Sequence, residues 1–356
     1  ENRSGTVGAG DGRIAERGGA TPRNHDHPSA QFGNVDVSQP MNSHPQQRRF
    51  GVMNLYKPAG VTSRDVVNIV QRLVRPNKVG HAGTLDPMAT GVLLVCVGPA
   101  TRLVSILQQA PKTYQAAFRL GVRSDTDDST GEIECVPVPE PVILPQIAST
   151  LRDFCGVIEQ TPPAYSAVKV DGQRAYALAR QGEDVALRAR PVRIDSIEVL
   201  AFQWPDLTVR IRCGSGTYIR SIARDLGERL GTGGLMTALE RTEIGDFRAA
   251  DSVNPDALTD GNLEDAILPA VGVVSHISQY RCSTEELATV RRGGAFDLDK
   301  SRFRKALLKA DRPADEEMLK KNPPVALVSE CGTELLALAE IRRQGRRIQP
   351  RTVFMS

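Results

Sequence analysis

The sequence has few aromatic residues (4%) and only six cysteines, none of them in a Cys-x-x-Cys pair. Scattered cysteines argue against a zinc site and a disulfide framework, and they suit a reducing compartment. No run of about 18 apolar residues occurs, so we expect no membrane span. The sequence also lacks a Gly-x-Gly-x-x-Gly motif and a P-loop, and therefore offers no recognisable site for a nucleotide cofactor.

The composition is that of a globular protein, with 40% hydrophobic and 24% charged residues. At 356 residues the chain is long enough for two domains with ordinary cores. The net charge of +3 says little about partners, but residues 342–351 contain five arginines and no acid. Such a run suits phosphate contacts, or it forms a solvated terminal face.

Residues 1–48 are predicted to be a disordered tail, because they carry many glycines and mixed charges but almost no large apolar residues. They contain no apolar segment typical of a secretory signal, which favours a cytoplasmic location. Three histidines lie in this tail at irregular spacing, so metal binding is not expected there.

Regular structure is predicted from residue 51 onward. Thr62 or Ser63 caps a helix that runs from Arg64 to about Val74 and carries an apolar stripe that begins at Val66. Further strands are expected at 51–58, 112–122 and 207–213, and helices at 144–154 and 219–230. This mixture has no regular βαβ repeat, which indicates an α+β fold with a largely antiparallel sheet flanked by helices.

The predicted domains are a catalytic domain at 49–272 and a small β-rich unit at 273–356. The second unit is expected to contain short strands at 325–328 and 335–339, preceded by a highly charged loop at 299–324. No internal repeat is found, and nothing in the sequence demands more than a monomer.

The most informative segment is Gly80–Leu93, which places the single carboxylate of Asp86 in a glycine-flanked turn before an apolar strand. Glycines allow a sharp bend or the close approach of a ligand. Asp86 is therefore a candidate reactive group displayed from a rigid strand. The ordinary alternative is a helix cap at Asp86, with Pro87 as the first helical residue.

This segment, Gly-His-Ala-Gly-Thr-Leu-Asp-Pro-Met-Ala-Thr-Gly-Val-Leu, resembles the signature of the TruB family, the bacterial tRNA pseudouridine-55 synthases. Further segments resemble the same family in its own order: 54–63, 112–131, 160–176, and 214–222 with 235–241. One departure is Ala82, which stands where many family members carry threonine.

The resemblance implies an isomerase that converts uridine to pseudouridine in the T loop of tRNA, with neither cofactor nor metal. A uridine in folded RNA must leave its stack before a side chain can reach it, so base flipping is expected. The family's catalytic nucleophile matches Asp86, and a carboxylate is ionised at neutral pH. Attack on the sugar C1′ and attack on the uracil C6 both remain open.

Two further residues match catalytic positions of the family. Arg220 would hold Asp86 ionised and fix its direction through bidentate hydrogen bonds. Tyr114 would pack against the uracil and handle its C5 proton. From the residues alone, Arg220 reads as a surface arginine beside a helix's apolar face, and Tyr114 as a buried strand tyrosine.

Four residues match substrate-binding positions. Tyr218 and Leu239 would line the uracil pocket, although Leu239 read alone is a core leucine. His81 would fill the gap or stack after the nucleotide flips, or it is a turn histidine bonded to the backbone. Lys57 would either contact phosphate or support the Asp86 loop.

The unit at 273–356 resembles the small RNA-binding PUA-like barrel of bacterial members, which implies tRNA, including its acceptor arm, as the partner. Two alternatives stay open: an RNA-binding or tRNA-folding protein without chemistry, and a synthase that acts on another RNA. A glycoside hydrolase would need a second acid in a matching motif. None accompanies Asp86.

Overall fold

The structure is a computed structural model. It describes residues 49–166, 168–170, 172–175, 178, 181, 187–275, 277–304, 324–342 and 346–355. The predicted tail at 1–48 and most of the charged loop at 299–324 lie outside the described residues. Among the described helices, none has the length and apolarity needed to cross a membrane.

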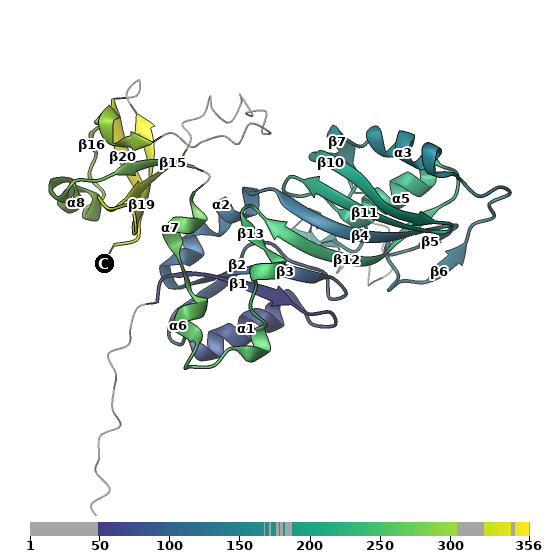
Figure 1. Ribbon diagram of the computed structural model, residues 1–356, viewed down its shortest axis with the longest axis horizontal. Helices are drawn as coiled ribbons and strands as arrows, with labels where there is room; N and C mark the ends of the chain where they lie inside the picture. The colour runs from purple at the N-terminus through teal and green to yellow at the C-terminus, as the bar shows by residue number, and fades with distance from the viewer. Residues whose placement is uncertain are drawn as a thin grey trace, which may run out of the picture. The chain divides into compact units, whose positions relative to one another are not determined.

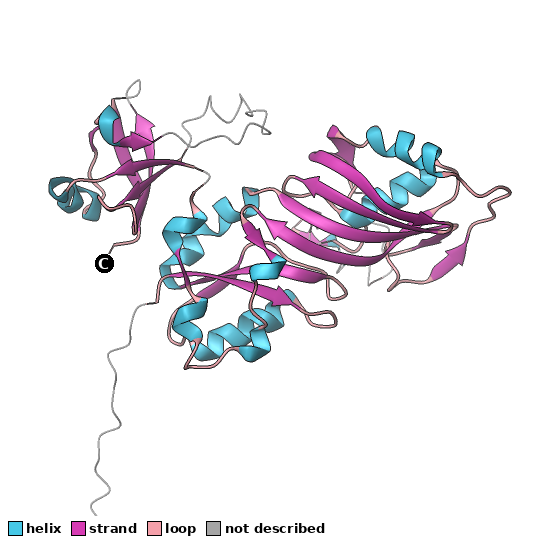
Figure 2. Ribbon diagram, viewed as in Figure 1, coloured by secondary structure: helices cyan, strands magenta, loops and turns pink. Residues whose placement is uncertain are grey.

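A large sheet of ten strands dominates the described chain (Figures 1 and 2). Its main path runs in the order β14-β1-β3-β12-β4-β11-β10-β7, with β2 beside β3 and β13 beside β12. The strands are β1 (Gly51–Lys57), β2 (Val79–His81), β3 (Thr90–Val97), β4 (Lys112–Leu120), β7 (Gly156–Gln160), β10 (Arg190–Gln203), β11 (Asp206–Cys213), β12 (Gly234–Ile244), β13 (Phe247–Arg248) and β14 (Leu268–Pro269). Among the described strands of this sheet, only β3 and β12 pair in parallel, which confirms the predicted largely antiparallel α+β fold.

Helices pack on this sheet through their apolar residues. The helices of the first part of the chain are α1 (Ser63–Leu73), α2 (Val104–Gln109), α3 (Leu144–Arg152), α5 (Ile219–Arg229), α6 (Leu263–Ala266) and α7 (Ala270–Val273). Helices α3 and α5 share one apolar core with β4, β10, β11 and β12, whereas α1 packs with β1 and β3 in another. A third apolar core joins β1, β3 and the end of β12 with α2 and α7.

Local sequence explains how the helix that flanks the candidate site begins. Thr62 caps α1: its hydroxyl accepts from Asp65 N at 3.1 Å, and the Asp65 carboxylate accepts from Thr62 N at 2.9 Å. This reciprocal pair is a capping box, which satisfies two backbone donors at once. It leaves Ser63 as the first helical residue, buried and facing the Asp86 loop.

A second sheet follows in the order β16-β20-β19-β18-β15-β17. Its strands are β15 (Ser278–Arg281), β16 (Phe296–Asp297), β17 (Phe303–Arg304), β18 (Val325–Val328), β19 (Leu335–Arg342) and β20 (Arg347–Val353). Helix α8 (Thr284–Arg291) packs on it through Val290, inside a core of its own. The β-rich character predicted for the C-terminal part is confirmed, and the domain limits 49–272 and 273–356 stay a prediction.

Two expected elements differ in the structure. The chain forms a turn at Asp86, in which Ala89 N donates to Asp86 O at 3.0 Å, and β3 begins at Thr90, so the helix-cap alternative is wrong. The strand expected at 112–122 breaks at Gly121, whose φ of 79° lies in the left-handed region. The chain continues in the ribbon β5 (Val122–Ser124) with β6 (Ile133–Cys135).

Candidate active site

Asp86 lies on a loop between β2 and β3 that is fastened to the body of the protein. Ser63 Oγ accepts from Leu85 N at 2.9 Å and donates to Leu85 O at 3.2 Å. The side chains of Leu85 and Ala89 are buried in the same core as α5. With its neighbours on both sides anchored in this way, Asp86 has a fixed direction while its side chain stays 37% exposed.

Arg220, on the first turn of α5, engages both oxygens of the Asp86 carboxylate. Its Nε lies 3.1 Å from Oδ2, and its Nη2 donates to Oδ1 at 3.4 Å. The Arg220 side chain is only 7% exposed. The pair predicted from sequence is thus brought together with the two-pronged geometry that suits a carboxylate.

The remaining donors of Arg220 are used as well. Nη1 donates to Thr126 O at 3.0 Å, and Nη2 to Tyr165 O at 3.1 Å. Nη1 also lies 3.4 Å from Oδ2 of Asp128, a carboxylate that is 5% exposed. Arg220 is therefore held between two carboxylates, of which only Asp86 is open to solvent.

Sequence reasoning missed Asp128, although it lies within a segment that resembles the family. Its carboxylate accepts from Thr130 N at 2.9 Å and from Thr126 Oγ1 at 2.8 Å. The signal that could have found it is the Asp-Thr-Asp-Asp-Ser-Thr run at 125–130, which offers hydroxyl donors next to an acid.

The electrostatic surroundings act on Asp86 in opposite directions. Burial raises the pKa of Asp86 above its ordinary value, and the nearby charge of Asp128 raises it further. Arg220 and Lys57 act against both effects, because they stabilise the ionised carboxylate. Loss of Arg220 would therefore raise the pKa of Asp86 further.

Lys57 lies beneath the loop and is completely buried. Its ammonium donates to Pro58 O at 2.9 Å, Val61 O at 2.7 Å and Pro87 O at 3.1 Å, which uses all three of its hydrogens. Burial lowers the pKa of Lys57 to about 8, against the attraction of Asp86. This geometry favours the support of the Asp86 loop over a phosphate contact.

Tyr114 and Leu239 extend from the two neighbouring strands β4 and β12. Tyr114 is half-buried and packs against the apolar cluster that contains Leu239, Leu85 and Ala89. Burial raises the pKa of the Tyr114 phenol, and Asp86 is among the charges that act on it. Both residues therefore belong to the apolar core that anchors the Asp86 loop.

His81 ends β2 and is half-buried. Its Nδ1 is buried and has no hydrogen-bond partner among the residues that the structure describes. Burial lowers the pKa of His81; the backbone of Gly83 opposes this effect, and the charges of Arg241 and Arg64 add to it. The imidazole is therefore favoured in its neutral form.

Tyr218 occupies the residue before α5, and two side chains hold it. The amide of Gln160 donates to Tyr218 O at 3.0 Å and accepts from Tyr218 N at 2.8 Å. The Arg190 guanidinium lies 5.1 Å from the centre of the Tyr218 ring and also donates to Gly216 O at 2.9 Å. Neither partner was identified from sequence. Together they fix the start of the helix that carries Arg220.

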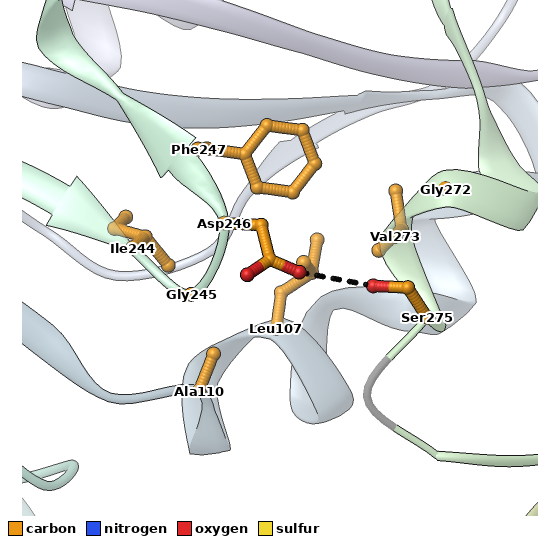
Figure 3. Close-up of a pocket in the computed structure, with 9 residues that line it drawn as sticks. All are labelled: Leu107, Ala110, Ile244, Gly245, Asp246, Phe247, Gly272, Val273 and Ser275. Atoms are coloured by element: carbon orange, nitrogen blue, oxygen red, sulfur yellow. Dashed lines mark hydrogen bonds between the residues drawn. The ribbon is translucent and has the colours of Figure 1, made fainter. Parts of the chain in front are cut away.

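A metal site and a further pocket are the other candidate sites to consider among the described residues. No group of three or more acidic, histidine or cysteine side chains among the described residues is placed to hold a metal ion. A hollow between α2, the β12–β13 turn and α7 is lined by Leu107, Phe247 and Val273, and Ser275 donates to Asp246 there at 3.2 Å (Figure 3). Its cavity volume of about 20 Å³ leaves room for roughly one water molecule, so it cannot hold a nucleotide.

Comparison with protein families gives two adjoining matches. Residues 71–219 match the N-terminal domain of the TruB family pseudouridylate synthases, and residues 220–271 match the tRNA pseudouridylate synthase B C-terminal domain. The second match lies inside the predicted 49–272 domain.

Individual relatives agree with these matches. The chain is 47% identical over 253 residues to a tRNA pseudouridine synthase B from Microcystis aeruginosa, covering 70% of this chain and 85% of the relative. The corresponding protein of Clostridium tetani is 41% identical over 225 residues, with coverages of 63% and 78%. Among solved structures, a Cbf5-Nop10-Gar1 complex contains a chain with a TM-score of 0.65 and 28% identity, which covers 86% of this chain and 85% of that chain. Since the fold, the family models and these identities agree, the chain belongs to the TruB family of pseudouridylate synthases.

Proposed function

We propose that the protein is a tRNA pseudouridine synthase that isomerises uridine 55 in the T loop, with Asp86 as its nucleophile. The observation that carries this proposal is the two-pronged pair of Asp86 and Arg220 on an anchored, solvent-accessible loop. The names of the similar proteins, tRNA pseudouridine synthase B, support tRNA as the substrate.

The reaction rearranges one nucleotide and needs no second substrate. The C1′–N1 bond breaks, a C1′–C5 bond forms, C5 loses its proton and N1 gains one. Because no electrons are transferred to or from another molecule, a carboxylate and a proton carrier suffice. Asp86, oriented by Arg220, supplies the carboxylate, and Tyr114 supplies the proton carrier.

Asp86 acts as the nucleophile, on C1′ or on C6 of the uracil. Arg220 keeps the carboxylate ionised against burial and holds it in one orientation, so that little reorganisation precedes attack. When Asp86 forms its covalent bond, the charge on its oxygens falls, and Asp128 remains to balance the Arg220 guanidinium.

The uracil enters between the loop and the β4–β12 strands. Leu239 and Tyr218 form apolar walls. The Tyr114 hydroxyl is the candidate relay of the C5 proton: its oxygen takes up that proton as it releases its own proton to water. His81 occupies the space left by the flipped nucleotide, for which a neutral imidazole suits stacking. Lys57 contributes by holding the carbonyl of Pro87 beneath the loop.

The β-rich unit at 273–356 is the proposed site for the acceptor arm of the tRNA. In its arginine run, Arg342 and Arg351 both lie near Glu340, at 3.6 and 2.9 Å, and Arg347 lies 3.5 Å from Asp297. These acids reduce the net charge of the run. Arg346 is exposed and is the first residue of the run to test for phosphate contact. A cytoplasmic location stays a prediction.

The test is an incubation of the purified protein, without cofactors, with an unmodified tRNA transcript, followed by carbodiimide-blocked primer extension. We expect a new stop assigned to T-loop uridine 55, absent with Asp86→Asn. Tight tRNA binding without any stop would instead favour an RNA-binding or tRNA-folding protein. A stop only on another RNA would favour a synthase with a different target.

A further inference from the structure

Arg241 is almost completely buried, with 2% of its surface exposed. It lies on β12 opposite Tyr114 of β4 and beside Gly91 of β3. Its Nε donates to Val92 O at 2.8 Å, and its Nη2 donates to Gly83 O at 3.1 Å. One side chain thus joins two segments that are nine residues apart.

These two carbonyls belong to the two ends of the Asp86 loop. Gly83 lies just after β2, and Val92 lies within β3, so Arg241 closes the loop from the side of β12. The backbones of Gly91 and Arg241 also lie close together, because a Cβ on Gly91 would lie 2.2 Å from Arg241 O. Glycine at this position lets β3 approach β12 closely enough for the guanidinium to reach both carbonyls.

The positive charge of Arg241 is buried without an acidic partner in the described chain. Within the described residues it has no salt-bridge partner, whereas Arg220 has two. A buried cation that contacts only neutral acceptors costs folding free energy, and an unbranched apolar side chain would fill the same space without that cost.

The positive charge acts directly on the candidate site. Burial raises the pKa of Tyr114, and the charge of Arg241 opposes this effect. Arg241 also lowers the pKa of Lys57, after the larger effect of burial. When the C1′–N1 bond breaks, the uracil keeps the electron pair of that bond and becomes an anion. A fixed positive charge beside the site favours such an anion over the neutral ground state.

We propose that Arg241 is a positioning residue for the isomerisation, which holds the Asp86 loop at Gly83 and Val92 and keeps a positive charge beside Tyr114. This inference rests on the proposed function, because it takes Asp86 and Tyr114 as the reacting groups. It adds a residue whose contacts are all with the protein rather than with the substrate.

The test compares Arg241→Lys and Arg241→Met with the wild type on unmodified tRNA transcript. Lysine keeps the charge but cannot hold both carbonyls, and methionine removes both functions. Arg210→Met is the matched control, because Arg210 is an exposed arginine on β11 that pairs only with Glu198 in the described chain. Single-turnover rate, tRNA dissociation constant and unfolding midpoint are measured for each variant.

We expect Arg241→Met to bind tRNA within about threefold of the wild type and to lose roughly 100-fold in single-turnover rate. Arg241→Lys should fall between the two, and Arg210→Met should match the wild type. The proposal is overturned if Arg241→Met keeps its rate, or if its rate falls only as far as its tRNA binding does. If Arg241→Met does not fold, a wild-type rate in Arg241→Lys overturns it.

Failure of the proposed function has a different signature. In that case Asp86→Asn would still form pseudouridine, or the wild type would form none. Loss of product in Asp86→Asn together with full activity in Arg241→Met would leave the proposed function standing and remove only the role of Arg241.

Discussion

Arg220 contacts both oxygens of Asp86, with Nε 3.1 Å from Oδ2 and Nη2 3.4 Å from Oδ1. The same guanidinium touches the buried carboxylate of Asp128 at 3.4 Å. Asp128 therefore helps to orient Arg220, and Arg220 in turn orients Asp86. Because Asp128 is almost inaccessible and Asp86 is not, Asp86 is the one of these two acids that a ligand can reach.

Replacement of Asp128 tests whether its carboxylate helps to hold Arg220 against Asp86. In Asp128→Asn, Arg220 loses a charged partner, and among the described residues Thr126 O and Tyr165 O remain, besides Asp86, to hold its guanidinium. We expect the single-turnover rate to fall roughly tenfold or more, with tRNA affinity unchanged. A stopped or quenched time course with enzyme in excess measures the rate. An unchanged rate would show that Thr126 O and Tyr165 O alone hold Arg220 in place.

The role of the Tyr114 hydroxyl is separated from that of its ring by Tyr114→Phe. The ring keeps its packing against the cluster around Leu239, so tRNA binding and folding should be unaffected. Loss of the proton acceptor should lower the rate of pseudouridine formation about 100-fold or more. Release of tritium from tRNA labelled at uridine C5 measures this step. Wild-type release would assign the C5 proton to another group.

The sequence predicted the elements whose patterns are local. The apolar stripe from Val66 to Val74 and the alternation around Val209 indicated a helix and a strand that the structure contains. The Asp86–Arg220 pair was also predicted, but through the family resemblance, since the two residues lie 134 positions apart. No local pattern carries information over that distance.

Sequence reasoning missed buried polar groups whose partners lie far away in the sequence. Asp128, Gln160 and Arg241 each lie in a segment with family resemblance, yet nothing nearby in sequence indicates their partners. Lys57 illustrates the same limit, because both a phosphate contact and loop support agree with its motif. Only its burial and its three carbonyl partners distinguish between them.

The close approach of β3 and β12 predicts that Gly91 tolerates no side chain. Gly91→Ala would place Cβ 2.2 Å from Arg241 O, at a φ of 101°. Gly156→Ala is the matched control, since Gly156 has a φ of 106° and an open Cβ position. We expect a loss of about 1 kcal/mol for the control from backbone strain, and about 3 kcal/mol or more for Gly91→Ala. Urea unfolding measures both, and equal losses would contradict the close approach.

The raised pKa of Asp127 should make the stability of the wild type depend on pH in a way that Asp127→Asn lacks. Burial raises the pKa of Asp127 to about 6, although Arg224 lies 2.7 Å from its carboxylate and opposes the shift. Between the unfolded value near 4 and the folded value, the native state therefore binds more protons than the unfolded state. Stability contributed by the protonated acid is present below about pH 4 and is lost as the pH rises through about 6.

Asp127→Asn isolates this effect, because asparagine also tolerates the φ of 60° at this position and cannot titrate. We expect the free energy of unfolding of the wild type to fall relative to that of Asp127→Asn as the pH rises from 4 to about 6. Urea denaturation at several pH values measures the difference. A difference that instead grows in favour of the wild type over this window would mean that the ion pair with Arg224 outweighs burial. The folded pKa of Asp127 would then lie below its ordinary value.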